Sequence, residues 1–326
     1  MNKLWNAGGR TIHLQEVVMR DGMLVEEAFV PTVSKIELVN ALSQSGMAKI
    51  EAAAFVSPQA IPALRDAETV LREIERVPGV TYSALVPDER GAERAIDARA
   101  DEFNLVMSAS ESHNRAHLRK TREQSFNALS DVNALARQAH VAVNLSLSCS
   151  FGCPMEGDVP AATVLAWCSQ FVEKMGARGV TLCDTTGMAR PRQVFELTRA
   201  FRARWPEAQL SLHFHDTQGL GLVNVLAAIS GGADRFDASL SGIDSSTHVR
   251  SAIENLHSDD IVHALELMGF DTGVDLKRLL EAATLLPAMV GHLQLRFHRA
   301  RRRLKFNTVL AADFDALRLR GLARDP

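Results

Sequence analysis

Two histidines separated by one residue, His213 and His215, are the first candidates for chemistry in this sequence. They end a strand-like run, and alternate residues of a strand face the same side, so both imidazoles can reach one cation. Asp21 and Asn255 follow other strand-like runs and could add a carboxylate and an amide oxygen. An H-x-H pair alone is equally typical of buried structural histidines. The additional Asp and Asn favour a divalent metal, and two imidazoles with two hard oxygens suit Mg²⁺ or Mn²⁺ better than tetrahedral zinc.

Three more polar residues at strand ends are candidates for catalysis. Arg20 precedes Asp21, and a guanidinium beside a metal can hold a substrate carbonyl oxygen and stabilise the negative charge that develops there. Arg20 could instead form a structural ion pair with Glu51, and both roles are compatible because Glu51 can orient Arg20. Asp184 is either a general acid/base or a partner of a metal ligand, and the sequence leaves both roles open.

A repeated strand–helix pattern must position these residues. About eight strand-like runs, from TIHLQEVVM to RFDASLS, alternate with helix-like runs over about 260 residues. The runs appear continuously apolar, as in parallel strands that are covered on both faces. Eight such units predict an α/β fold of the (β/α)8 TIM-barrel class, with its active site at the carboxyl ends of the strands. A Rossmann-like doubly wound sheet is the alternative, but no glycine fingerprint follows an early strand.

The pattern changes after Phe270. We expect a catalytic barrel over residues 11–272 and a C-terminal helical extension with a basic tail over residues 273–326. The extension contains VDLKRLLEAATLLPAMVGHLQLRF, and no acidic residue occurs from Ala282 to Ala312. The basic run RFHRARRRLKF is typical of a solvated helix beside the barrel, and the alternative is an arm that binds a partner or a phosphate.

Composition limits the class of protein. The chain has 326 residues, 46% of them hydrophobic, which is enough for a large core. A net charge of −3 excludes a general attraction to nucleic acid or to an anionic membrane. No run reaches the roughly 18 apolar residues of a membrane span, and the N-terminus lacks the apolar core of a signal peptide. The cysteines, Cys149, Cys153, Cys168 and Cys183, show no paired framework, so we expect reduced thiols in a cytoplasmic protein.

Five segments stand out, in chain order EVVMRDG, KIEAAAFVSP, SLSCSFGCPMEG, LCDTTG and HFHDTQGLGLVN. They resemble 3-hydroxy-3-methylglutaryl-CoA lyase and its relatives, the metal-dependent lyase, synthase and aldolase barrels. The resemblance runs from about Thr11 to Leu280. It implies a (β/α)8 barrel with a divalent metal held by Asp21, His213, His215 and Asn255.

The resemblance also implies a reaction. In the lyases a base removes the proton of a tertiary hydroxyl, and the carbon–carbon bond of an acyl-CoA substrate breaks to give acetyl-CoA enolate and a keto acid. Arg20 would stabilise the enolate, and Asp184 lies where the family has an acidic active-site residue. The relatives are commonly dimeric, and TLLPAMVGHLQL adds apolar residues beyond the barrel, so we expect a homodimer. The alternative is a helix that covers the bottom of its own barrel.

The loop SLSGIDSSTHVRSAIEN, residues 239–255, departs from this pattern. The lyases have GGCPYAxGxxGN here, and its cysteine takes part in catalysis. An ungapped alignment places Ser246 at that cysteine and non-glycine residues at four of the glycines. A serine cannot replace a thiol of lowered pKa without a strong base beside it. Leu24 also stands where related lyases have a glutamine.

We therefore expect a metal-dependent carbon–carbon lyase that acts on a 3-hydroxyacyl-CoA, with a complete metal site but weak or absent cleavage of 3-hydroxy-3-methylglutaryl-CoA. There are two alternatives to this lyase. One is a related aldolase or condensing enzyme that does not need a loop cysteine. The other is a catalytically silent protein that keeps the metal pocket.

Overall fold

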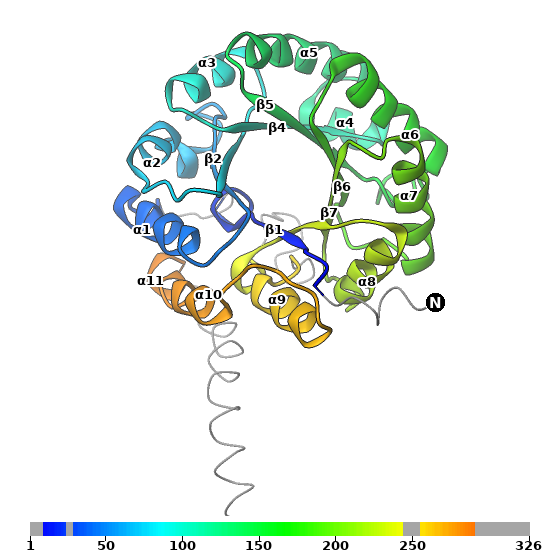
Figure 1. The fold of residues 1–326 in the computed structure, drawn as a ribbon. Helices are drawn as coiled ribbons and strands as arrows, with labels where there is room; N and C mark the ends of the chain where they lie inside the picture. Colours follow the sequence, from blue (N-terminus) through cyan, green and yellow to red (C-terminus); the bar gives the residue numbers. More distant parts are fainter. Residues whose placement is uncertain (1–8, 24–28, 244–254, 291–326) are drawn as a thin grey trace, which may run out of the picture.

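The computed structural model describes residues 9–23, 29–243 and 255–290, which form a (β/α)8 barrel (Figure 1). Eight parallel strands follow one another in chain order around the barrel, and β1 pairs with β8 to close it. The predicted fold class is confirmed. The strands are β1 (His13–Glu16), β2 (Lys49–Ala54), β3 (Thr81–Leu85), β4 (Glu102–Ser108), β5 (Ala142–Ser148), β6 (Gly179–Asp184), β7 (Gln209–Phe214) and β8 (Arg235–Ala238).

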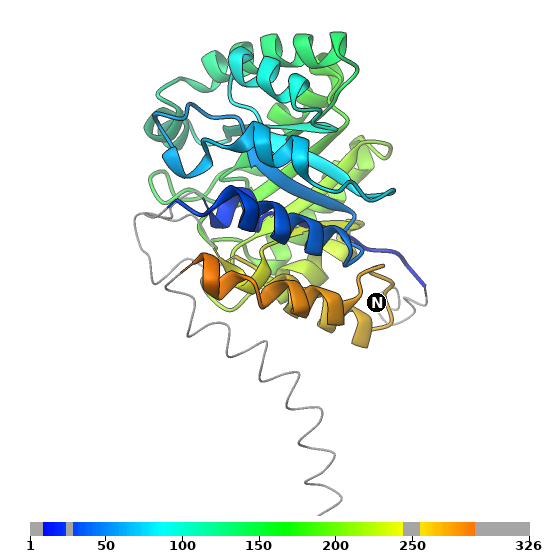
Figure 2. The same ribbon diagram turned by 90° about the vertical axis from the view of Figure 1, so that its left-hand side faces the viewer.

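Helices surround the strands on the outside of the barrel (Figures 1 and 2). They are α1 (Thr32–Ser43), α2 (Ala67–Glu73), α3 (Glu89–Asp97), α4 (Glu111–Leu118), α5 (Arg122–Gln138), α6 (Ala161–Ser169), α7 (Pro191–Arg204), α8 (Gly221–Gly231), α9 (Ser258–Leu267), α10 (Leu276–Ala283) and α11 (Leu286–Met289). Local sequence explains several starts: Thr121 and Gln124 form a capping box at α5, and the Asp88 side chain caps α3.

The two faces of the strands differ in polarity. Residues such as Ile50, Phe103 and Leu212 alternate with polar ones and belong to the buried apolar core. The intervening residues face the barrel interior, and many are polar and buried, including Gln15, Glu51, Ser83, Asn104, Asn144, Thr181, Ser211 and Asp237. The prediction of strands that are apolar on both faces is therefore wrong for the inner face, where side chains form hydrogen bonds with one another.

The first strand is shorter than the run TIHLQEVVM predicted. It ends at Glu16, and a π-helical turn, η1 (Val18–Gly22), follows. The buried Glu16 carboxylate accepts a hydrogen bond from the Val18 backbone N–H at 2.9 Å, and the Asp21 N–H bonds to the Val17 carbonyl at 2.7 Å. These bonds turn the chain away from the ladder. Arg20 and Asp21 therefore lie on a turn above the end of β1.

The segment after α9 packs against the barrel wall. Helix α10 contacts α1 and α9, and the Asp275 backbone N–H donates to the Ser45 carbonyl at 2.8 Å. Gly46 makes this approach possible, because a Cβ there would lie 2.2 Å from the Gly273 carbonyl oxygen and the residue has a φ of +87°. The helical extension expected from VDLKRLLEAATLLPAMVGHLQLRF contains the helices α10 and α11, and the last residues of this segment lie outside the described ranges.

None of the helices in the described ranges combines the length and the apolar character that a membrane crossing requires. All four cysteines are free thiols in the structure. The homodimer and the boundary at residue 272 stay predictions, and the basic run RFHRARRRLKF lies outside the described residues.

Candidate metal centre and active site

The structure brings Asp21, His213 and His215 together at the carboxyl end of the barrel. Asp21 comes from η1 and the histidines from the end of β7. One potential ligand atom from each of the three lies within 4.8 Å of the others, and His213 Nε2 is 4.0 Å from Asp21 Oδ2. Two atoms that each lie roughly 2.1–2.2 Å from one cation are at most about 4.4 Å apart. The cluster therefore fits one divalent metal with only small side-chain movements.

Asn255 adjoins this cluster, as the sequence predicted. Its Nδ2 donates to Asp21 Oδ2 and to the Ile243 carbonyl, each at 2.8 Å. These two acceptors determine the orientation of the amide, because a flipped group would place Oδ1 against oxygen atoms. Oδ1 is buried and has no hydrogen-bond partner among the described residues. A buried amide oxygen without a donor is suited to a cation ligand.

Both histidines are oriented through their Nδ1 atoms. His215 Nδ1 lies 2.6 Å from the Asp184 carbonyl oxygen, which requires a proton on that nitrogen. His213 Nδ1 lies 3.4 Å from Asp237 Oδ2. Because Nδ1 of each ring faces an oxygen, Nε2 is the ring nitrogen that would ligate a cation. Partners of this kind are typical around metal-ligating histidines.

Arg20 is held by two carboxylates. Its Nε donates to Glu51 Oε2 at 2.7 Å, and Nη1 donates to Asp21 Oδ1. Glu51 is fully buried on β2, and its other oxygen accepts from Asn104 Nδ2 at 2.8 Å. The predicted Arg20–Glu51 ion pair is thus present, and it orients Arg20 beside the metal cluster.

Charge explains the protonation of the Arg20–Asp21 pair. Burial by itself raises the pKa of Asp21, but the charges of Arg20, His213 and His215 and the Asn255 amide together hold that pKa below its usual range. Burial likewise opposes the charge on Arg20, yet Asp21 and Glu51 raise its pKa above the ordinary value. The pair is therefore fully ionised at neutral pH, as a carboxylate ligand and an oxyanion donor require.

Asp184 ends β6 next to the cluster. Its Oδ1 accepts from the backbone N–H groups of Met188 (2.7 Å) and Ala189 (3.1 Å). Its buried Oδ2 has no partner among the described residues. Burial raises the pKa of this carboxyl, although the two backbone donors and His215 oppose the shift. Asp184 therefore contacts His215 through its backbone carbonyl, and its Oδ2 makes no hydrogen bond within the described residues.

Sequence reasoning did not identify Asp237, Asn104 and Glu16 as residues that support the site. Asp237 on β8 faces His213, and Asn104 on β4 supports Glu51. Glu16 joins three segments, because it accepts bonds from Val18 N (2.9 Å), Leu240 N (2.9 Å) and Ser258 Oγ (2.6 Å). The sequence did contain a sign of these residues: each is a charged or amide side chain inside a strand, and such a side chain needs a hydrogen-bond partner when it is buried. Ser246 and Leu24 lie outside the described residues.

Comparison with known proteins identifies the family. The HMGL-like family model matches residues 11–286. This chain belongs to the HMGL-like family. The hydroxymethylglutaryl-CoA lyase YngG of Bacillus subtilis (strain 168) is 40% identical over 282 residues, which are 86% of this chain and 94% of that protein. The mitochondrial hydroxymethylglutaryl-CoA lyase of Rattus norvegicus is 37% identical and covers 84% of each chain.

Solved structures agree with this family assignment. An HMG-CoA lyase from Acinetobacter baumannii, in complex with coenzyme A and 3-methylmalate, superimposes with a TM-score of 0.81 at 43% identity, over 86% of this chain and 92% of that one. The hydroxymethylglutaryl-CoA lyase from Pseudomonas aeruginosa gives a TM-score of 0.86 at 32% identity, over 92% and 99%. The resemblance found in the five sequence segments is confirmed, and the relatives support a lyase of this HMGL-like family.

Proposed function

We propose that this protein is a divalent-metal-dependent carbon–carbon lyase that cleaves a 3-hydroxyacyl-CoA to acetyl-CoA and a keto acid. The observation that carries the proposal is the position of Arg20, which is hydrogen-bonded to Asp21 of the Asp21–His213–His215 cluster. The lyase relatives, and coenzyme A in the Acinetobacter structure, support the same reaction class.

The cleavage places specific demands on the site. A base takes the proton of the 3-hydroxyl, the C2–C3 bond breaks, and its electron pair becomes the enolate of the acetyl thioester. The enolate then takes a proton at carbon to give acetyl-CoA. A divalent cation held by Asp21, His213, His215 and Asn255 would supply positive charge for the hydroxyl and carboxylate oxygens of the substrate.

Arg20 is suited to the thioester oxygen. A guanidinium has five N–H donors, and its bonds to Glu51 and Asp21 use two of them. The three others are available to an oxygen on which negative charge develops. Because Glu51 and Asp21 already hold the group, little reorganisation is needed during the reaction.

Asp184 is suited to move the hydroxyl proton. Two backbone N–H groups orient its carboxylate, and the buried Oδ2 has no partner among the described residues. Its backbone carbonyl separately orients His215. An Asp184→Asn variant distinguishes these roles, because it keeps the carbonyl. We expect normal metal content with much lower turnover. A loss of metal would instead assign Asp184 a purely supporting role.

The proton for the enolate needs another source. Ser246 occupies the position of the family's loop cysteine, so we propose that 3-hydroxy-3-methylglutaryl-CoA is a poor substrate.

Cys183 is a thiol of this site that is not fully buried. It pairs with His213 in the β6–β7 ladder. Burial and the nearby Asp237 raise its pKa well above the ordinary value, although Arg20 opposes the shift, so it is a protonated thiol beside the cluster. We propose Cys183 as the proton donor.

The test is acetyl-CoA release from a panel of 3-hydroxyacyl-CoA thioesters with Mg²⁺ or Mn²⁺ present. Arg20→Ala and Asp184→Asn should lose activity, whereas Arg192→Gln should not, because the Arg192 side chain is 89% exposed on α7. Stoichiometric metal binding without acetyl-CoA release from any thioester would contradict the lyase and favour a silent metal-binding homologue. Condensation of acetyl-CoA with a keto acid, without net cleavage, would favour the condensing-enzyme alternative.

A further inference from the structure

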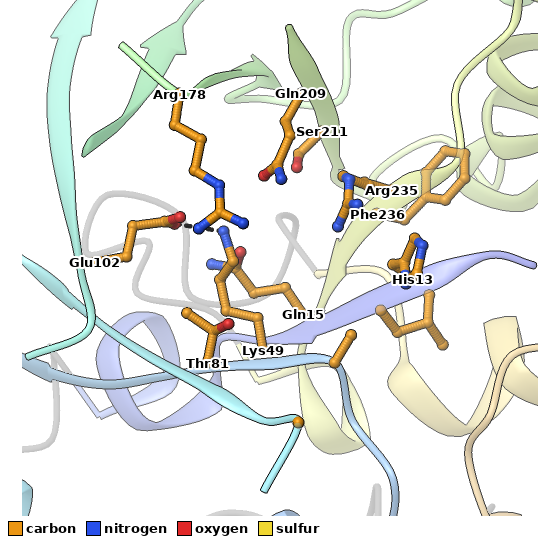
Figure 3. Close-up of a pocket in the computed structure, with 13 residues that line it drawn as sticks. His13, Gln15, Lys49, Thr81, Glu102, Arg178, Gln209, Ser211, Arg235 and Phe236 are labelled. Carbon is orange, nitrogen blue, oxygen red and sulfur yellow. Dashed lines mark hydrogen bonds and ion pairs between the residues drawn. The ribbon is translucent and has the colours of Figure 1, made fainter. Parts of the chain in front are cut away.

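A polar cavity of about 210 Å³ opens at the amino ends of the barrel strands (Figure 3). Six of the eight strands contribute their first residue to its lining: His13, Lys49, Thr81, Glu102, Gln209 and Arg235. The metal cluster lies at the other end of the same barrel, where β6 and β7 finish. The cavity is therefore separate from the site described above.

Positive charge dominates this cavity. Its lining includes three permanent cations, Lys49, Arg178 and Arg235, and one carboxylate, Glu102. Lys49 Nζ donates to Glu102 and neutralises it. The formal balance is three minus one, or +2, although the chain as a whole carries −3. This excess is local, and it favours an anion.

The two arginines have no carboxylate of their own. Among the residues that the structure describes, neither Arg178 nor Arg235 forms an ion pair or a side-chain hydrogen bond. Asp234, the acidic neighbour of Arg235 in the chain, is bound by Arg202 at 2.9 Å. Figure 3 shows the Arg178 side chain extending toward the centre of the ring of residues, with Arg235 on the β8 side. Their N–H donors are thus available to a ligand.

Neutral donors complete the lining. Gln15, Thr81, Gln209 and Ser211 line the cavity, and Gln15 and Ser211 are buried. The charge of Arg235 reaches into this space, because burial and Arg235 together lower the pKa of His13. A group with several oxygen acceptors could bind two guanidinium groups and these donors together, which is the geometry that arginine favours for phosphate and carboxylate.

The volume limits the ligand. Pockets for drug-sized ligands measure about 300–1,000 Å³, and this cavity, at about 210 Å³, is smaller, so it suits a small ligand better than a whole coenzyme A. We propose that this cavity binds a small free oxyanion, either inorganic phosphate or a short dicarboxylate. The proposal does not depend on the lyase reaction or on the metal.

The experiment is calorimetric titration of the metal-loaded protein with inorganic phosphate and, separately, with succinate. Sodium chloride keeps the ionic strength constant, because exposed charges are screened by salt. The variants are Arg178→Gln and Arg235→Gln, with Arg178→Lys to keep the charge. Arg192→Gln is the matched control for loss of a surface arginine, and Arg20→Ala reports binding at the metal end.

We expect saturable binding of at least one probe, and the tighter one identifies the class of oxyanion. Each glutamine variant should weaken it about 10- to 100-fold, as expected for the loss of a charge-assisted hydrogen bond. Arg178→Lys should retain part of the affinity, and Arg192→Gln and Arg20→Ala should retain all of it. Equal affinity in the wild type and both glutamine variants, loss of binding in Arg20→Ala, or no saturable binding of either probe would overturn the proposal.

A second measurement locates the anion independently of affinity. The imidazole of His13 lines the cavity, and its pKa is lowered by burial and by Arg235, with Asp234 opposing the shift. A bound anion should move the His13 titration, followed by NMR and assigned with His13→Gln, to higher pH. An unchanged His13 titration at saturating probe would place the anion elsewhere and would refute the site.

Discussion

Asp237→Asn should weaken metal binding without abolishing it. Asp237 Oδ2 lies 3.4 Å from His213 Nδ1, and the residue is almost fully buried on β8. Its carboxylate favours the proton on Nδ1 and so presents Nε2, the atom that faces Asp21, to a cation. The asparagine keeps the size of the side chain and can still accept a hydrogen bond, but it removes the charge.

The structure sets the size of the expected effect. Loss of a partner that orients a metal-ligating histidine typically costs about 10–100-fold in metal affinity. A distance of 3.4 Å exceeds the usual 2.7–3.2 Å of an N–H···O bond, so the contact is weaker than an ideal one. We therefore expect a loss near tenfold, or about 1.4 kcal/mol. Asp21→Ala, which removes a proposed ligand, should lose most of the bound cation.

The assay is calorimetric titration of metal-free protein with Mn²⁺. Asp158→Asn is the control, because the Asp158 side chain is 77% exposed and should not affect the site. Thermal unfolding of each metal-free variant separates loss of affinity from loss of fold. Wild-type Mn²⁺ affinity in Asp237→Asn would show that the Asp237–His213 contact does not tune the ligand. Complete loss of binding would show that Asp237 is itself a ligand.

Further predictions concern four residues. Arg20→Ala should lower turnover about 10²–10³-fold, as loss of an oxyanion donor does, with metal content unchanged; near-normal rates would exclude the enolate role. Cys183→Ala should slow acetyl-CoA release while leaving Mn²⁺ binding intact, and equal rates would show another proton donor. Ser246→Cys should give only partial acetoacetate formation from 3-hydroxy-3-methylglutaryl-CoA, and full lyase activity would show that the loop backbone is competent. Burial raises the pKa of Glu16 from 4.5 to about 7, so the native state binds a proton that the unfolded state has lost. The free energy of unfolding should therefore fall as the pH rises from about 4.5 to 7, by at most about 3 kcal/mol. Glu16→Gln should flatten this pH dependence in chemical denaturation, and an unchanged pH dependence would contradict the role of Glu16.

The residues at the strand ends could be located from the sequence, because the alternation of side chains along a strand is a local pattern. The alternation in QLSLHFH places His213 and His215 on one side of β7, and the barrel rule places that end beside η1. The same reasoning led to Arg20, Asp21 and Asp184. The turn η1 was not predictable from apolar content, because VVM favours a strand. The buried Glu16 carboxylate, which binds the Val18 N–H, ends the strand instead.

Supporting residues were missed because their partners are distant in the sequence. Asn104 and Glu51 are 53 positions apart, yet they form a 2.8 Å hydrogen bond across the barrel interior. Asp237 meets His213 only because β8 pairs with β7. The sequence of an apolar run with one polar residue does not show how that strand aligns with its neighbours. This alignment decides which side chain the polar residue contacts. The tertiary structure supplies this information.

The polar interior of the barrel links stability to the placement of Arg20. Asn104 donates to Glu51 while its own Oδ1 accepts from Asn144 (3.2 Å) and Ser146 (2.8 Å). Removing one member leaves the others buried without partners, at about 1–3 kcal/mol for each neutral group and more for a charge. The apolar outer face of the strands provides the hydrophobic stabilisation of the fold. The inner network adds little net stability because burial of its groups offsets their bonds. Its effect is positional: Glu51, held by Asn104, has one orientation in which to hold Arg20, and this contact fixes the Arg20 guanidinium beside Asp21.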